Sequence, residues 1–174
     1  MPKILENVRE KLLTEAKKQV TEFGYSAMTI RSVASACGVG VGTVYNYFPS
    51  KDMLIATFML EDWMIGIQMI SDGMKEADNV KEALYCMYRE LLKYKEKYIG
   101  LFSDENAEAS YVVSWMQRHQ MLCEQLAEPI KEWTCKQDKV DEIFLAEFIA
   151  ESMLSLTMRG KDFDAVASVL LRLF

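Results

Sequence analysis

Residues 29–51 place small and apolar side chains in a pattern that few folds can accommodate. Apolar residues recur at helical spacing after Thr29, whose hydroxyl is suited to cap a helix. The pattern stops at Gly38, because glycine enters the left-handed conformation without steric cost, and a second apolar pattern then continues to Phe48. At Ala34 two helices joined by so short a turn have to cross, and a larger side chain would push them apart. The stretch therefore predicts a helix-turn-helix.

Glycine-joined helix pairs occur in many helical proteins, so the pair alone does not indicate DNA binding. The outer face of the second helix provides the further evidence. This face carries no aliphatic residue but several hydrogen-bonding groups. It consists of Gly42, Thr43, Tyr45 and Asn46. Lys51 follows just beyond Pro49, at a position from which its ammonium can reach a phosphate. The pattern favours a helix that enters a DNA groove.

The run FGYSAMTIRSVASACGVGVGTVYNYFPSKDML resembles the amino-terminal signature of the TetR family of transcriptional regulators. The matching elements are Phe23–Gly24, Thr29, Val33–Ala34, Gly38–Val39, Gly42 to Tyr45 and Tyr47 to Lys51. The resemblance covers about the first third of the chain, and the remainder is similar to the family only in being helical and of suitable length. It implies an all-α fold, with a three-helix DNA-binding domain over residues 1–50 and a helical ligand-binding and dimerisation domain over 51–174.

The resemblance also implies which side chains touch DNA. The positions that usually contact phosphates are Thr29, Thr43, Tyr45, Tyr47 and Lys51. The positions closer to base edges are Arg31, Val41 and Asn46. One position departs from the family pattern, because Gly40 stands where relatives usually carry serine. Glycine supplies no side-chain donor there, but it lets the backbone amides approach a phosphate closely.

The charge of the chain is divided unevenly between its ends. The formal net charge is −6, which by itself argues against a nucleic-acid partner. Residues 1–52, however, hold seven basic side chains against five acidic ones, whereas the rest holds 13 against 21. Positive potential is therefore concentrated at the helix-turn-helix. We expect double-stranded DNA with a palindromic operator as the partner, bound by two copies of the chain.

Long helices are expected throughout, because only three prolines and eight glycines interrupt 174 residues. The first helix is predicted from Lys3 to Phe23, and the fourth from Lys51 to Gly73. The later helices are predicted to begin at Asn79, Ser103, Asp138 and Asp162. The sixth should break or kink near Pro129, because proline removes a helical hydrogen bond.

Composition argues against a membrane span, a metal site and a disulfide framework. The mostly apolar run from Met53 to Leu60 is too short to cross a membrane, and the charged start MPKILENVREKLL is unlike a signal peptide. The cysteines show neither C-x-x-C pairing nor a histidine at zinc spacing, which favours buried free thiols. They are Cys37, Cys86, Cys123 and Cys135. We expect a reduced, cytoplasmic compartment, no membrane partner and no cofactor.

The seventh helix is apolar nearly all round, with only a narrow stripe of polar residues. So wide an apolar surface has to be covered on several sides. Either it is a central core helix, or it forms a subunit interface together with the last helix. The resemblance favours the second interpretation, a homodimer in which the last two helices pair with their copies in a four-helix bundle.

Twelve methionines and three tryptophans suggest an adaptable interior that suits a flexible apolar or aromatic ligand, although a plain core explains any single methionine. The candidate lining residues are Trp63, Tyr88, Trp115, His119 and Phe148. His119 is the single histidine, and a hydrogen-bonded structural role is favoured over a metal ligand.

Three classes of function remain to be weighed. An enzyme has little support, because the sequence shows no histidine–carboxylate pairing, no glycine-rich phosphate loop and no catalytic residue. A ligand-responsive transcriptional regulator, most simply a repressor released by a small molecule, fits the residues best. The alternative is a DNA-bound adaptor whose larger domain binds a protein and senses no small molecule. An open cavity would favour the first, and a dry, filled core the second.

Overall fold

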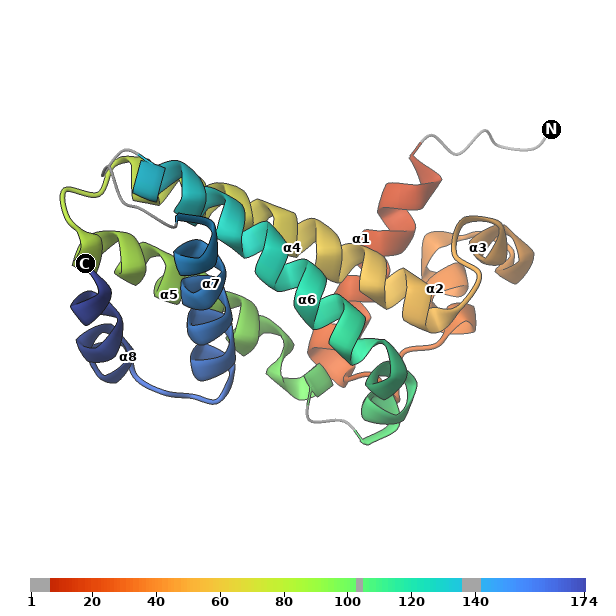
Figure 1. The fold of residues 1–174 in the computed structure, drawn as a ribbon. Helices are drawn as coiled ribbons and strands as arrows, with labels where there is room; N and C mark the ends of the chain where they lie inside the picture. The colour runs from red at the N-terminus through yellow and green to blue at the C-terminus, as the bar shows by residue number, and fades with distance from the viewer. Residues whose placement is uncertain (1–6, 103–104, 136–141) are drawn as a thin grey trace. The chain divides into compact units, whose positions relative to one another are not determined.

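The computed structural model describes residues 7–102, 105–135 and 142–174, without the side chains of residues 102, 105–118, 135 and 142. These ranges contain helices and no strand, so the predicted all-α class is confirmed (Figure 1). The helices in chain order are α1 (Val8–Phe23), α2 (Ile30–Cys37), α3 (Val41–Tyr47), α4 (Lys51–Lys75), α5 (Val80–Phe102), α6 (Glu105–Cys135), α7 (Glu142–Met158), α8 (Phe163–Leu170) and the 3-10 turn η1 (Leu171–Leu173).

The chain packs as two compact units. The first comprises Met1–Asp62 and Lys97–Val112, and the second comprises Trp63–Glu96 and Val113–Phe174. Helices α4, α5 and α6 each contribute to both units. This division describes packing alone, and the functional boundary between residues 50 and 51 remains a prediction.

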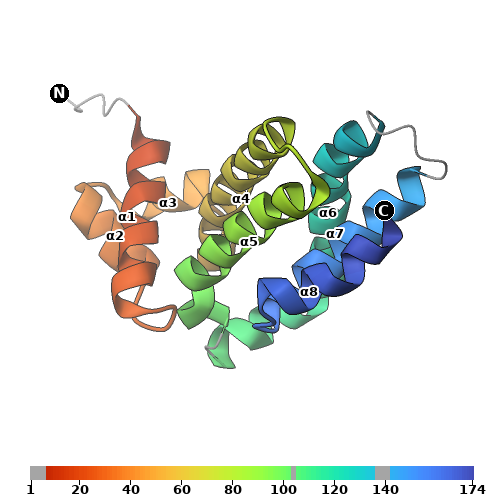
Figure 2. The ribbon, with the colours of Figure 1, turned by 90° about the vertical axis from the view of Figure 1, so that its left-hand side faces the viewer.

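In the first unit, α1 packs against α2 and α2 against α3 (Figure 2). The buried side chains recur at helical spacing, which is the reason each amphipathic segment folds onto the others. They are Leu12, Leu13, Ala16 and Val20 of α1, Ile30, Val33 and Ala34 of α2, and Val44 of α3. Ala34 is 1% exposed, as expected for the point where the two short helices cross. This core fixes the helix-turn-helix as one body.

An ion cluster around Asp62 of α4 also holds the first unit together. The Lys17 ammonium of α1 donates to Asp62 Oδ1 at 2.6 Å, and Lys97 and the hydroxyl of Tyr98 contact Oδ2. Burial alone would raise the pKa of the Asp62 carboxyl, but the hydrogen bonds from these three residues outweigh it and hold the pKa below its ordinary value. Lys17 therefore has a structural partner within the first unit.

Helix α4 is long and apolar enough to cross a membrane by length and composition, with a mean hydropathy of 1.4 over its most apolar 18 residues. Core helices of soluble proteins pass the same test, so this property is weak evidence for a span. Its side chains also contribute to protein cores, with Leu54, Ile55 and Phe58 buried in the first unit. The absence of a membrane partner remains a prediction.

The core of the second unit is built from α4, α5, α6, α7 and α8. Pro129 lies inside α6, which continues to Cys135, so a break near this proline is wrong, whereas a kink stays a prediction. The flanking residues explain the difference, because Leu126, Ala127 and Ile130 are all buried in this core. Their packing offsets the single helical hydrogen bond that proline removes.

The ends of the other helices follow local capping. Helix α1 begins at Val8, later than the predicted Lys3, and Asn7 before it has a left-handed φ of 61° that does not continue a helix. Asp162 caps α8 by accepting from the Ala165 amide at 2.9 Å. Helix α8 then gives way to η1, so the last helix is shorter than predicted. The predicted starts Ser103 and Asp138 lie outside the described residues.

Candidate nucleic-acid interface

The turn between α2 and α3 forms for the local reasons that the sequence indicated. The Thr29 hydroxyl accepts from the Ser32 amide at 2.9 Å, and the Ser32 hydroxyl accepts from the Thr29 amide at 3.0 Å, which completes a capping box. Gly38 ends α2 with a φ of 67°, and a Cβ there would meet no atom within 4 Å. The glycine is therefore required by backbone conformation and not by crowding.

Gly40 directly precedes α3 and has an extended conformation that any residue adopts, with φ −73° and ψ 149°. A Cβ at Gly40 would lie 3.8 Å from Thr43 Oγ1, an ordinary van der Waals contact. The fold of the free chain therefore does not demand glycine at this position. After the buried Phe48 ends the helix, the Ser50 hydroxyl accepts from the Met53 amide at 3.1 Å and caps α4.

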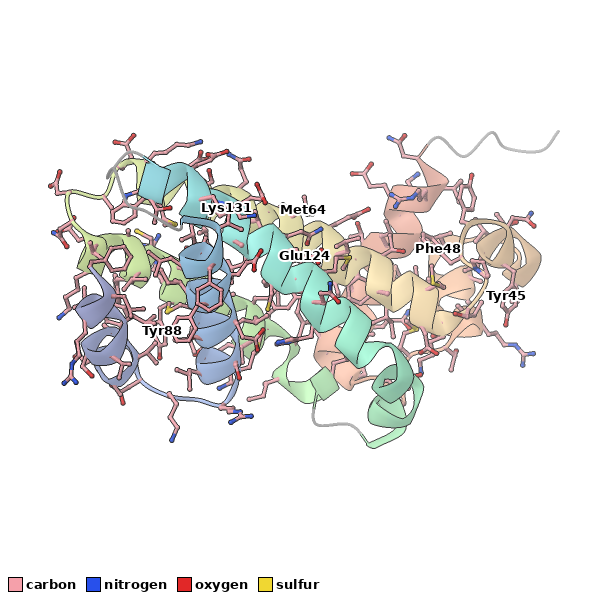
Figure 3. All side chains as sticks on the ribbon, viewed as in Figure 1. Tyr45, Phe48, Met64, Tyr88, Glu124 and Lys131 are labelled. Atoms are coloured by element: carbon pink, nitrogen blue, oxygen red, sulfur yellow. The ribbon has the colours of Figure 1, made fainter. Side chains whose placement is uncertain are left out.

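The predicted DNA-binding residues lie at the start of α2, along α3 and at the start of α4. Most of them are exposed, and Tyr45 projects from α3 with half of its surface accessible (Figure 3). The exposed ones are Thr29, Arg31, Gly40, Val41, Tyr45, Asn46 and Tyr47, and the half-buried ones are Thr43 and Lys51. Because Val44 faces the core, α3 has a buried apolar side and an outer side rich in hydrogen-bonding groups. DNA contact by these nine residues remains a prediction.

Lys51, the first residue of α4, contacts Tyr25. Its ammonium donates to the Tyr25 carbonyl oxygen and lies 3.8 Å from the centroid of the tyrosine ring, a cation–π contact. The Tyr25 hydroxyl in turn donates to Asp52 Oδ1 at 2.7 Å. A phosphate contact by Lys51 has to form beside this interaction or in place of it.

Two of the residues predicted to line a ligand pocket are engaged within the second unit. The indole N–H of Trp63 donates to Gln125 Oε1 at 2.8 Å, and its ring meets Tyr94 edge to face. The hydroxyl of Tyr88 donates to the Lys161 carbonyl oxygen at 3.1 Å. Trp63 is buried and Tyr88 is half-buried. Both side chains thus have structural partners, and their role in ligand binding remains a prediction.

A small apolar cavity of about 10 Å³ lies in the second unit. Its lining consists of Met74, Val80, Ala83, Leu84, Met87, Ile130, Trp133, Ile149 and Phe174. None of the five predicted pocket residues is in this lining: Phe148 is exposed, and the side chain of Trp115 lies outside the described residues. The cavity has room for about one water molecule and is too small for an organic ligand as it stands.

His119 lies in a cluster that the sequence did not reveal. Its Nε2 is 2.8 and 2.9 Å from the two carboxylate oxygens of Glu151 on α7 and 3.6 Å from Cys123 Sγ, one turn along α6. The Cys123 thiol donates to Glu151 Oε2 at 3.1 Å. Burial and this carboxylate raise the pKa of Cys123 to about 12, so the thiol stays protonated. The i, i+4 spacing of His119 and Cys123 was visible in the sequence, but Glu151 comes from another helix.

The free cysteines among the described residues are half-buried, not fully buried as predicted. They are Cys37, Cys86 and Cys123. Partial burial leaves Cys37 and Cys123 within reach of polar neighbours, such as the Lys11 carbonyl oxygen 3.5 Å from Cys37 Sγ.

Helices α7 and α8 expose large apolar side chains. Phe144 is 72% exposed, which is unusual for a phenylalanine in a folded unit. The exposed members of this face, which we call the α7–α8 face, are Ile143, Phe144, Phe148, Val169 and Leu173. The seventh helix is therefore not enclosed by its own chain.

Known proteins similar to this chain include helix-turn-helix regulators. Residues 12–57 match the model of a family described as bacterial regulatory proteins, tetR family. The chain is 34% identical over 105 residues to the HTH-type transcriptional regulator YhgD of Bacillus subtilis, covering 58% of this chain and 54% of that one. It is 25% identical over 100 residues to the HTH-type transcriptional repressor KstR2 of Mycolicibacterium smegmatis, covering 56% and 49%.

The crystal structure of the TetR family repressor AlkX from Dietzia has the same fold. It superimposes with a TM-score of 0.69 at 18% identity, over 94% of this chain and 93% of that one. At this identity the comparison shows a shared fold, and within it α2 and the outward-facing α3 form a helix-turn-helix. The amino-terminal part of the chain, residues 12–57, is similar to the tetR family, which confirms the resemblance that the sequence indicated. The matches span about half the length of the curated relatives YhgD and KstR2.

Proposed function

We propose that this chain is a homodimeric transcriptional repressor that places α3 of each copy in the major groove of a palindromic operator. The observation that carries the proposal is the outer side of α3, where Tyr45, Asn46 and Tyr47 are exposed above a buried Val44. A short helix of this kind positions itself through phosphates and distinguishes sequence through base edges. Arg31 at the start of α2 supplies a second base-reading group.

The dimer in this proposal forms through the α7–α8 face. An exposed apolar patch of this kind marks a protein interface, and a closed pair of identical faces buries it on both copies at once. Phe144 and Phe148 would then pack against their copies in a four-helix bundle. Two copies are needed because one seven-residue helix makes too few contacts for specific binding.

We further propose that the second unit responds to a small apolar or aromatic ligand. AlkX is implicated in biodegradation of n-alkanes, which sets a precedent for an apolar substrate class among proteins of this fold. The cavity beside Met74 and Met87 would have to enlarge, and flexible methionine side chains make this inexpensive. The predicted lining residues Trp63 and Tyr88 belong to this part of the proposal, whereas the exposed Phe148 belongs to the dimer contact.

The small size of the described cavity favours a second candidate function. An adaptor that binds DNA and recruits a protein through its larger unit needs no ligand pocket. In both candidates the chain acts in the cytoplasm, where its DNA lies, and performs no catalysis.

The decisive experiment begins with genomic DNA fragments of the source organism, from which the purified full chain selects those that it binds. The chain is incubated with that DNA and a panel of alkanes, fatty acids and aromatic acids, and release is measured by fluorescence anisotropy. Release by one chemical class supports the ligand-responsive repressor. Retention against every compound, together with a protein that co-purifies on the DNA-bound chain, supports the adaptor. Failure to retain any DNA contradicts both.

A further inference from the structure

The geometry points to a metal site: we propose that His119, Cys123 and Glu151 bind one divalent transition-metal ion of the zinc class. The three side chains come from α6 and α7, and their ligand atoms all lie within 4.8 Å of one another. His119 and Cys123 stand one helical turn apart on α6, so both point to the same side. Glu151 reaches them from α7 and closes the third position.

The separations between the ligand atoms suit a tetrahedral ion. Bonds of about 2.0–2.3 Å at tetrahedral angles place nitrogen, oxygen and sulfur ligands about 3.4–3.6 Å apart. Cys123 Sγ and His119 Nε2 are already 3.6 Å apart. The carboxylate oxygens of Glu151, now 2.8–3.1 Å from those two atoms, have to withdraw by about 0.5 Å, which rotation of a glutamate side chain provides.

The ligand types select the class of metal. A thiolate and an imidazole favour zinc, cobalt, nickel or iron over magnesium and calcium, which prefer oxygen ligands alone. When the metal binds, the sulfur–metal bond forms as the sulfur–hydrogen bond of Cys123 breaks, and the proton leaves to solvent. No electron is transferred. The side chain of Glu151 is 55% exposed, so solvent can supply the fourth ligand.

The same three residue types also occur in cysteine–histidine–acid catalytic triads, but the arrangement here differs. In a triad, the two nitrogens of the histidine face different partners, one the nucleophile and the other the acid. Here one atom, Nε2 of His119, faces both Cys123 and Glu151. Three ligand atoms that converge on one point can coordinate a single cation. They do not form the acid–histidine–nucleophile chain through both ring nitrogens that a triad requires.

The site would tie α6 to α7 by direct coordination. The two helices are joined at this position by hydrogen bonds among exposed or half-buried groups, which contribute little individually. A bound metal ion stabilises the folded chain by mass action. The proposal concerns the second unit alone and does not depend on DNA binding.

The test is titration of the metal-free full chain with Co²⁺, followed by its absorption spectrum. We expect saturation at one Co²⁺ per chain, with a thiolate-to-cobalt charge-transfer band and the strong visible bands of tetrahedral cobalt, both displaced by Zn²⁺. Cys123→Ser should lose the charge-transfer band and weaken binding by about 100-fold or more. The matched control is Cys86→Ser, which removes another half-buried thiol of the same unit and should keep the band.

A second pair of variants keeps the proposal testable if Cys123→Ser misfolds. Glu151→Gln should weaken Co²⁺ binding and abolish the rise in melting temperature that Zn²⁺ causes in the wild type. Glu147→Gln, which removes the same charge one turn earlier on α7, should leave both unchanged. A wild-type chain without a charge-transfer band would overturn the proposal, as would equal metal affinity in Glu151→Gln and Glu147→Gln.

Discussion

Two exposed surfaces of this chain differ in kind. The outer side of α3 exposes hydroxyl and amide groups on Tyr45, Asn46 and Tyr47, whereas α7 exposes Phe144 and Phe148. A polar surface stays hydrated until a charged, hydrated partner such as DNA replaces the water. An apolar surface is stable only when another apolar surface covers it. The comparison therefore agrees with the proposal that α3 contacts DNA reversibly and that α7 makes a lasting protein contact.

Charged residues on α7 should break this comparison most completely. Phe144→Glu combined with Phe148→Glu places four carboxylates at the centre of the proposed dimer, so we expect monomers in sedimentation at micromolar concentration. Operator affinity should fall by about 100-fold or more, because central aromatic anchors carry most of the energy of an interface. The matched control is Met64→Glu combined with Met69→Glu, two similarly exposed residues of α4. Monomeric wild type with full operator affinity would refute the assignment.

Arg31→Ala should have the next largest effect, and only on sequence preference. Arginine can bond guanine at two points, which is worth about 1–3 kcal/mol of discrimination. Affinity for the operator should therefore fall while affinity for random DNA changes little, as measured by competition at fixed salt. Lys18→Ala, which removes an exposed charge of α1, is the control. Equal losses on both DNAs would mean that Arg31 does not read a base.

Asp62→Asn tests the scaffold of the first unit without touching either surface. Loss of the charged hydrogen bonds from Lys17 and Lys97 should lower the free energy of unfolding by about 1–2 kcal/mol at neutral pH. Because the folded-state pKa of Asp62 is lowered, its contribution is present above the ordinary carboxyl pKa and is lost as pH falls through the lowered value. Denaturant melts of both proteins should therefore converge in acid. A gap that widens in acid would contradict the pKa direction.

Gly40→Ser sharpens the contrast by adding a donor to the α3 surface. The extended backbone and the open space around Gly40 admit a serine, whose hydroxyl can cap α3 and donate to a phosphate. We expect DNA binding to tighten by about 1 kcal/mol. Weaker binding by the variant would show that close approach of the backbone is what the site requires. The control is Gly42→Ser, which adds the same hydroxyl two residues later in the chain.

Lys51→Ala should have the smallest effect. A lysine that contacts a phosphate supplies affinity without sequence preference, so all DNAs should be weakened alike and the salt dependence reduced by about one counterion. Tyr25 already holds the ammonium, which limits the gain that a phosphate adds. An unchanged slope of log affinity against log salt would remove Lys51 from the interface.

The first unit was predictable because its determinants are local. Thr29, Gly38 and Ser50 each set a helix end through atoms within four residues, so the sequence alone located α2, α3 and the start of α4. The fate of Pro129 and the partners of His119 depend on packing between distant segments. A proline is tolerated when buried neighbours hold the helix, and no spacing rule connects Glu151 with residues 28 and 32 positions earlier.

The central claim is that two copies of α3 bind one operator, and footprinting on DNA retained from the chain's own genome tests it most directly. The wild type should protect two half-sites related by two-fold symmetry, with their centres a whole number of helical turns apart. Protection should disappear in Tyr45→Ala combined with Asn46→Ala, while that variant remains folded and dimeric. A single unsymmetrical footprint, or protection that survives the loss of both side chains, would contradict the account.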